Sequence, residues 1–96
     1  MTLLPLDGPA EYKNITVTST PQELKVGAAA LDERKVATIQ PLDGDIYYGY
    51  DNSVSSTTGT KIFKGQMFPM EAGTMLTVWL VAAGSDSVDT RITEVG

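Results

Sequence analysis

The sequence predicts an all-β fold: a single small antiparallel β-sandwich or barrel of about seven or eight strands, preceded by an extended N-terminal arm. Along most of the chain, β-branched and aromatic residues alternate with polar residues at a period of two. Glycine and proline interrupt this alternation about every ten residues, and no helical period extends over about 12 residues. The 96 residues leave room for one core, which we place at 11–96, after an arm at 1–10.

The first strands are expected at residues 12–19 and 22–26, where apolar residues recur on one face and Pro21 separates the two runs. Residues 28–35 are the only stretch rich in helix formers, but they are too few to form a stable isolated helix. We therefore expect a turn of helix there, or a loop pinned by Leu31.

The middle of the chain predicts a hairpin. A strand at residues 35–40 leads into the turn Pro41–Gly44, whose proline, aspartate and glycine each favour a tight turn. Residues 45–51 are then expected to return as the partner strand. Residues 52–60 have almost no apolar content and predict a loop, held down by Val54.

The last third predicts four more strands. Short strands are expected at residues 61–64 and 66–70, and Pro69 places the second at a sheet edge or at its own end, because proline donates no ladder hydrogen bond. Residues 74–82 are apolar on both faces, which indicates a central strand. Residues 87–95 alternate as in a half-exposed final strand.

Composition narrows the function. The chain has no cysteine and no histidine, so it lacks the commonest nucleophile, general base and metal ligands. We therefore expect neither an enzyme nor a cofactor. Asp43, Asp45, Asp51 and Asn52 offer oxygens for calcium, but aspartates beside glycine are ordinary turn residues, and no metal site is predicted. The sequon at Asn14 is treated as coincidence, because the chain carries no secretion signal.

Charge and hydropathy exclude two classes of partner. The formal net charge is -5, from 12 acidic and 7 basic residues, and the basic residues are scattered. Phosphate binding needs concentrated positive charge, so no nucleic-acid partner is expected. No apolar run approaches the roughly 20 residues of a membrane span, so no membrane partner is expected and a soluble protein is predicted.

Two features are candidate partner-binding sites. Tyr47 shares one expected strand with Tyr48 and Tyr50, and strand alternation cannot turn all three inward. The favoured arrangement places Tyr48 and Tyr50 in the core with Tyr47 covering an edge; the alternative makes Tyr47 an exposed contact for a protein or a sugar.

The second candidate is the N-terminal arm. Its three leucines, Leu3, Leu4 and Leu6, flank Pro5, which disfavours a helix at the residue before it. Three leucines have little reason to remain in water, so the arm is expected either to dock on a neighbouring subunit or to be a frayed terminus.

Over roughly residues 11–95, the order of strands and turns resembles that of small virion proteins of tailed bacteriophages. The resemblance is carried by Arg34–Gln40, Asp45–Val54, Gly59 and Met70–Thr74. The similar proteins are accessory β-sandwich proteins of the head, such as decoration or cement proteins and head fibres. Pro41 departs from the pattern, which often has asparagine there, and the pattern implies no catalytic residue.

This resemblance implies a capsid decoration or cement protein that binds and stabilises the head shell. The implied partners are the major capsid protein or other virion proteins and sister copies of the chain, with a trimer favoured. The implied location is the capsid surface, after synthesis in the bacterial cytoplasm. Two alternatives stay open: a receptor- or glycan-binding head-fibre module that uses Tyr47 and the loop at 51–60, and a structural ring component of the neck or tail.

Overall fold

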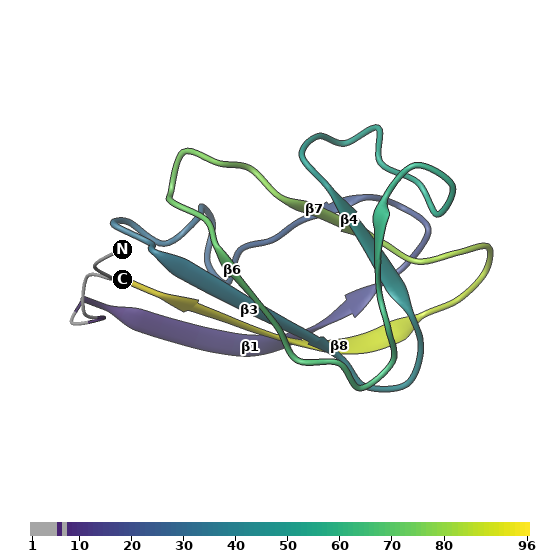
Figure 1. Cartoon of the computed structure of the whole chain (residues 1–96), viewed down its shortest axis with the longest axis horizontal. Helices are drawn as coiled ribbons and strands as arrows, with labels where there is room; N and C mark the ends of the chain where they lie inside the picture. Colours follow the sequence, from purple (N-terminus) through teal and green to yellow (C-terminus); the bar gives the residue numbers. More distant parts are fainter. Residues whose placement is uncertain (1–5, 7) are drawn as a thin grey trace.

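Eight strands form two four-stranded antiparallel sheets, and no helix is present in the computed structural model, which describes residues 6 and 8–96 (Figure 1). The strands are β1 (Ala10–Val17), β2 (Gln22–Glu23), β3 (Val36–Pro41), β4 (Ile46–Gly49), β5 (Thr60–Ile62), β6 (Phe68–Glu71), β7 (Trp79–Val81) and β8 (Val88–Val95). One sheet has the order β1-β8-β3-β6 and the other has the order β2-β7-β4-β5. The predicted fold class, a small antiparallel β-sandwich or barrel of about seven or eight strands, is confirmed, and of the two it is a sandwich.

The strand order is that of a jelly roll, which the sequence did not reveal. β1 pairs with β8, β2 with β7, β3 with β6 and β4 with β5, as in one long hairpin. The β3–β8 and β4–β7 ladders show that this hairpin is wrapped around itself to make two layers. Two four-stranded sheets related in this way define the jelly-roll architecture.

The predicted hairpin at residues 35–51 is wrong, because β3 and β4 belong to different sheets. The turn between them is present, but it crosses from one layer to the other. Asp43 does not bond its own backbone there: its Oδ1 accepts a hydrogen bond from the backbone N–H of Asp89, at 2.8 Å. A carboxylate that holds the neighbouring strand suits a crossing turn as well as a hairpin turn, so local turn chemistry could not separate the two.

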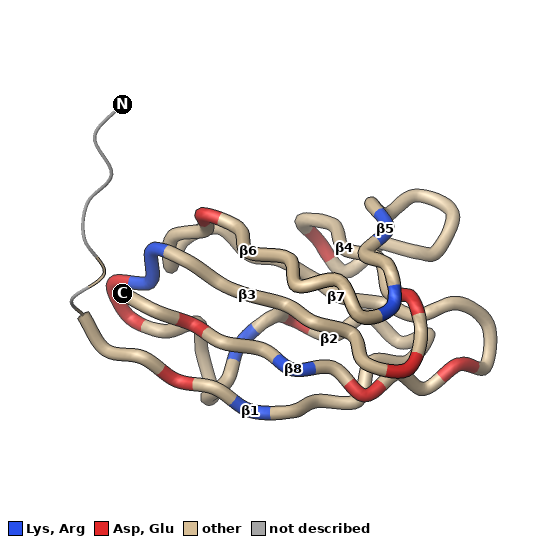
Figure 2. The backbone as a smooth tube through the Cα atoms, turned by 60° about the horizontal axis from the view of Figure 1, so that its bottom comes forward, with Lys and Arg blue, Asp and Glu red and all other residues tan. Residues whose placement is uncertain are grey.

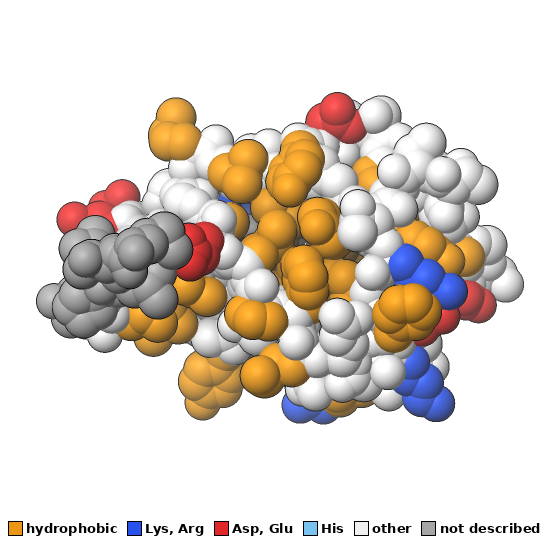
Figure 3. Space-filling view, viewed as in Figure 1, with side chains coloured by type: hydrophobic (Ala, Val, Ile, Leu, Met, Phe, Trp, Pro, Cys, Tyr) orange, Lys and Arg blue, Asp and Glu red, His pale blue; other side chains and the backbone are white. Residues whose placement is uncertain are grey.

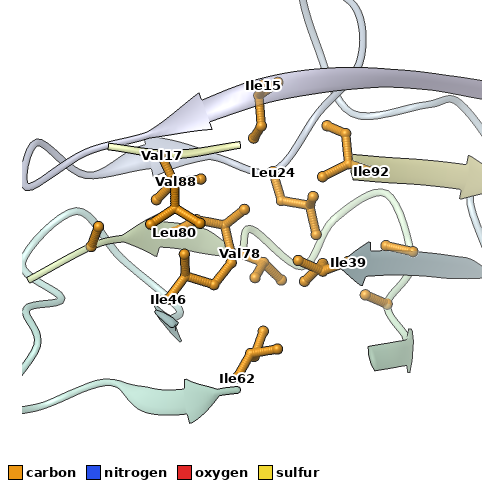
Figure 4. Packing of buried hydrophobic residues seen from close by; sticks show 13 residues of the cluster. Ile15, Val17, Leu24, Ile39, Ile46, Ile62, Val78, Leu80, Val88 and Ile92 are labelled. Atoms are coloured by element: carbon orange, nitrogen blue, oxygen red, sulfur yellow. The ribbon is translucent and has the colours of Figure 1, made fainter. Parts of the chain in front are cut away.

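The core lies between the two sheets, and Figure 4 shows its aliphatic side chains converging from both layers. Alternation produces this arrangement: Val88, Ile92, Val17 and Ile39 point inward while their strand neighbours point out. Val54 and Leu31, each expected to pin a loop, are both buried. The core therefore comes almost entirely from residues that the period-two pattern identifies.

Several strands are shorter than expected, among them β2 and β7. The strand expected at 22–26 is β2, only Gln22–Glu23, although Leu24 beyond it is buried as predicted. The strand expected at 74–82 is β7, only Trp79–Val81, although it lies inside its sheet as predicted, between β2 and β4. Residues 28–35 form a loop without a helical turn.

The sandwich has two open sides, where the sheets face each other without hydrogen-bonding. The β1/β2 side is bounded by the outer strands β1 and β2, and the β5/β6 side by β5 and β6. β6 contains Pro69, so the prediction that proline marks an edge strand is confirmed. Within the described residues, no helix is long and apolar enough to cross a membrane.

Candidate functional site

The most buried polar group of the domain is an ion pair between Arg34 and Glu94. The Arg34 Nη1 donates to Glu94 Oε2 at 2.8 Å, and both side chains are fully removed from solvent. The remaining donors of Arg34 bond the carbonyl oxygens of Leu24, Ala72, Gly73 and Leu76 at 2.8–3.3 Å. Glu94 accepts the backbone N–H groups of Val26 and Leu31, at 2.8 and 3.1 Å.

This network is structural. It fastens the segment after β2 and the segment after β6 to β8. The carbonyl groups of Ala72, Gly73 and Leu76 accept hydrogen bonds from the Arg34 side chain instead of from a neighbouring strand. Across residues 6 and 8–96, no buried side-chain polar atom lacks a hydrogen-bond partner. The full satisfaction of Arg34 leaves it no donor for a ligand.

The sequence contained a signal for Glu94 that was missed. Val88, Thr90, Ile92 and Glu94 occupy every second position of β8 and are all buried. A carboxylate on the inward face of a strand requires a buried cationic partner. The identity of that partner depends on which loop reaches β8, so Arg34 could not be named from the pattern.

The β5/β6 side is closed by aromatic rings. The ring of Tyr48 lies 5.4 Å from that of Phe68 and 6.1 Å from that of Tyr50. Tyr48 and Phe68 pack against the core, as expected for Tyr48. The expectation that Tyr50 fills the core is wrong, because its side chain is 57% exposed. β4 ends at Gly49, so Tyr50 lies past the sheet, where the second layer no longer covers it.

Further large apolar side chains lie on β6 and on the connections beside it. We call this set the apolar surface: Tyr48, Tyr50, Phe63, Met67, Phe68, Met70, Met75 and Leu76. Except for the two tyrosines, its members belong to β6 or to the connections on either side of it. Figure 3 shows hydrophobic side chains gathered in the middle of this face, between β6 and β4.

Tyr47 lies on the outer side of its strand and is partly covered by a loop. It points to the outer face of its sheet, where its strand partners are Lys61 and Val81. The loop at 50–59 folds back on it: a Cβ atom at Gly59 would lie 2.9 Å from the Cβ of Tyr47 and 2.8 Å from Val54. Tyr47 is therefore half-buried under its own loop.

The β1/β2 side holds an open groove of about 460 Å³. Its lining includes Lys13, Thr20, Gln22, Glu23, Lys25 and Trp79. Glu23 and Lys25 form a partly buried ion pair at 3.7 Å, and Trp79, also partly buried, lies between Glu23 of β2 and Gly49 of β4. Sequence analysis did not single out this site, because its residues meet only when β7 is placed beside β2.

The aspartates considered as calcium ligands, for which no metal site is predicted, serve separate local roles. Asp45 accepts the backbone N–H of Lys64 at 2.7 Å, and this bond, with Lys61 nearby, lowers the pKa of the Asp45 carboxyl below its usual value. Asp51 bonds the side chain and backbone of Ser53, which lowers the pKa of that carboxyl. Among residues 6 and 8–96, no three carboxylates gather as metal ligands would.

Of the predicted arm, Leu3 and Leu4 lie outside the described residues, and Leu6 is 51% exposed. The point at which the arm joins the domain is fixed. Gly8 donates its N–H to the carbonyl of Gly96 at 3.1 Å, and Gly96 donates to the carbonyl of Pro9 at 2.8 Å. The arm and the last residue of the chain therefore meet at one end of the sandwich.

Acidic and basic positions are interspersed around the sandwich (Figure 2). The chemical contrast lies instead between the apolar surface on the β5/β6 side and the polar groove on the β1/β2 side. Comparisons of the chain with protein-family models, with curated proteins and with solved structures gave no match.

Proposed function

We propose that this chain is a structural virion protein of a tailed bacteriophage, a decoration protein that binds and stabilises the capsid shell through its apolar surface. The observation that carries the proposal is the chemistry of that surface. Single exposed apolar residues are common, but a gathering of them usually marks an interaction site. Tyrosine, phenylalanine and methionine, which dominate here, are also enriched at protein–protein interfaces.

The fold is compatible with this role but does not select it. Jelly rolls occur in viral capsid proteins, in lectins and in cupins, so the architecture alone assigns no function. The selection comes from the side chains, because an aromatic and methionine-rich surface fits a protein partner better than a small polar substrate. The proposed partners are the major capsid protein or other virion proteins and sister copies of the chain.

The arm supplies a second proposed anchor. Leu6 is exposed two residues before Gly8, whose N–H donates to the Gly96 carbonyl, so the place where the arm joins the domain is fixed. On a shell with threefold sites, three arms leaving in register would hold three copies together, which favours a trimer. Deletion of residues 1–7 should therefore lower capsid occupancy; unchanged occupancy would remove this role from Leu3, Leu4 and Leu6.

Binding to purified capsids that lack this protein tests the main proposal. We expect Tyr50→Ser to weaken cosedimentation by tenfold or more, because loss of a central interface aromatic costs about 2 kcal/mol. Tyr12→Ser is the matched control, since Tyr12 is 82% exposed on the outer face of β1, away from the apolar surface. Wild-type occupancy by Tyr50→Ser, or loss of binding by Tyr12→Ser instead, would contradict the proposed surface.

Native mass spectrometry addresses the alternative virion location. A trimer agrees with a threefold capsid site, whereas a larger closed ring would favour the neck or tail axis. Electron microscopy of intact particles carrying a tagged chain would then locate the protein directly.

A further inference from the structure

The groove on the β1/β2 side is not used by the proposed capsid contact. It lies on the side of the sandwich opposite the apolar surface, bounded by the other pair of outer strands. A chain attached to a particle through the β5/β6 side would present this groove outward. Its volume of about 460 Å³ is within the usual range for small-molecule sites.

Trp79 gives the groove an aromatic wall. The register of β7 sets Trp79 between Glu23 on β2 and Gly49 on β4, so two neighbouring strands fix its backbone. Trp79 is partly buried, which restricts its side chain, and it is one of the residues that line the groove. A rigid aromatic of this kind offers contact area at low entropic cost.

The rest of the lining is polar and of mixed type. The Thr20 hydroxyl and the Gln22 carboxamide each both donate and accept hydrogen bonds. The Glu23 carboxylate accepts, and its partner Lys25 donates. An aromatic wall beside donors and acceptors matches a pyranose ring, which has an apolar C–H face and a rim of hydroxyl groups.

Other ligand classes fit less well. A polyphosphate would meet the Glu23 carboxylate, and an apolar ligand would leave the polar lining unpaired. A peptide strand added to β2 would find only two ladder residues, directly after Pro21, and of the longer outer strand β1 only Lys13 lines the groove. Within residues 6 and 8–96, Lys13 forms no ion pair, so its ammonium group is available to a ligand carboxylate.

We propose that this groove binds a saccharide, with the indole of Trp79 against the sugar ring, Gln22 and Glu23 on its hydroxyl groups, and Lys13 favouring sugars that carry a carboxylate. The inference is independent of the capsid assignment, because the two sites share no residue.

The chain has a single tryptophan, so its fluorescence reports on the groove alone. The purified full chain is titrated with maltotriose, a neutral probe, and with trigalacturonic acid, a carboxylated probe, after a glycan array has broadened the panel. We expect a saturable shift of the Trp79 emission, with tighter binding of the carboxylated sugar. No shift with any saccharide up to about 10 mM, which corresponds to a negligible affinity, would overturn the proposal.

Variants that keep the fluorophore locate the site. Gln22→Ala should weaken both probes at least fivefold, and Lys13→Ala should weaken only trigalacturonic acid, by about tenfold. Lys13 is exposed, so its replacement leaves the fold intact even where that of Gln22 does not. Tyr50→Ser is the control for the other side and should leave sugar affinity unchanged.

The outcomes separate the two proposals. Loss of capsid binding in Tyr50→Ser with sugar binding retained supports both. If both Lys13→Ala and Gln22→Ala bind trigalacturonic acid as tightly as the wild type does, the groove is not the sugar site. An emission shift caused by extended peptides and by no saccharide would overturn the glycan assignment in favour of strand addition.

Discussion

The two open sides of this jelly roll differ in the side chains that line them. On the β5/β6 side, rings from β4 and β6 fill the gap between the sheets, and apolar side chains extend to the surface. The β1/β2 side instead carries an open groove with a mainly polar lining. A single small domain can thus carry an apolar side and a grooved, mainly polar side, because the core between the sheets is built by other residues.

Arg34 connects the two sides, and its replacement should have the largest effect. Its guanidinium bonds the carbonyl of Leu24 after β2 and that of Ala72 after β6, besides the Glu94 carboxylate. Arg34→Met would leave the carboxylate buried without its cation, so we expect the free energy of unfolding to fall by about 3–5 kcal/mol. Urea denaturation measures this, and hydrogen exchange should show both loops opening faster.

Two further variants sharpen this test. Arg91→Met removes an exposed pair with Asp89 and should cost less than about 1 kcal/mol. The double variant Arg34→Met with Glu94→Leu removes both buried charges and should recover part of the loss. If Arg34→Met is no less stable than Arg91→Met, the hydrogen bonds and ion pair of Arg34 contribute little to the free energy of unfolding.

The contrast between the sides also explains what could be predicted from the sequence. Period-two alternation identified the sandwich and nearly all core residues, because each side chain's face depends only on its own strand. Pro69 identified an edge strand for a similarly local reason, its missing N–H. The groove, the Arg34–Glu94 pair and the exposure of Tyr50 depend on which strands become neighbours, and alternation carries no such information.

A substitution at Gly49 tests how tightly the loop at 50–59 packs against β4. It lies across from Trp79, and an added Cβ would come within 2.7 Å of Val54 Cγ2. Gly49→Ala should therefore displace the loop at 50–59 and cost about 1–3 kcal/mol in a urea titration. Gly27→Ala, on the groove, is the control: its added Cβ would lie 3.9 Å from the nearest atom, so stability should change little. Equal losses of stability in the two variants would contradict tight packing at Gly49 and open space at Gly27.

Each side has one solvent-accessible ion pair, and the contributions of the two pairs to the free energy of unfolding can be compared. Lys61 of β5 lies 3.4 Å from Asp45 and also 5.1 Å from the centre of the Phe63 ring. Lys25, after β2, has only its pair with Glu23 at 3.7 Å. We expect Lys61→Ala to cost about 0.5–1 kcal/mol and Lys25→Ala less than about 0.5 kcal/mol, because the first also loses a cation–π contact. The difference should persist at high salt only if the ring contact contributes.

The smallest expected effect is the contribution of Asp45, on the β5/β6 side, to the acid dependence of stability. The Lys64 N–H, and then Lys61, lower the pKa of the Asp45 carboxyl below its ordinary value of 3.8. The unfolded chain therefore takes up the proton first as the pH falls. Asp45 contributes its full stabilisation above pH 3.8, and the contribution is lost as the pH falls through the lower pKa of the folded state.

Urea midpoints measured from about pH 6 down to about pH 3 test this linkage. Asp45→Asn should lower stability slightly at neutral pH, and its curve should approach that of the wild type in acid. Other carboxylates, including Asp51, titrate in both proteins, so the difference between the two curves isolates Asp45. Parallel curves over the whole range would show that the Lys64 N–H holds an asparagine oxygen as well as it holds the carboxylate, and that charge contributes nothing to this edge.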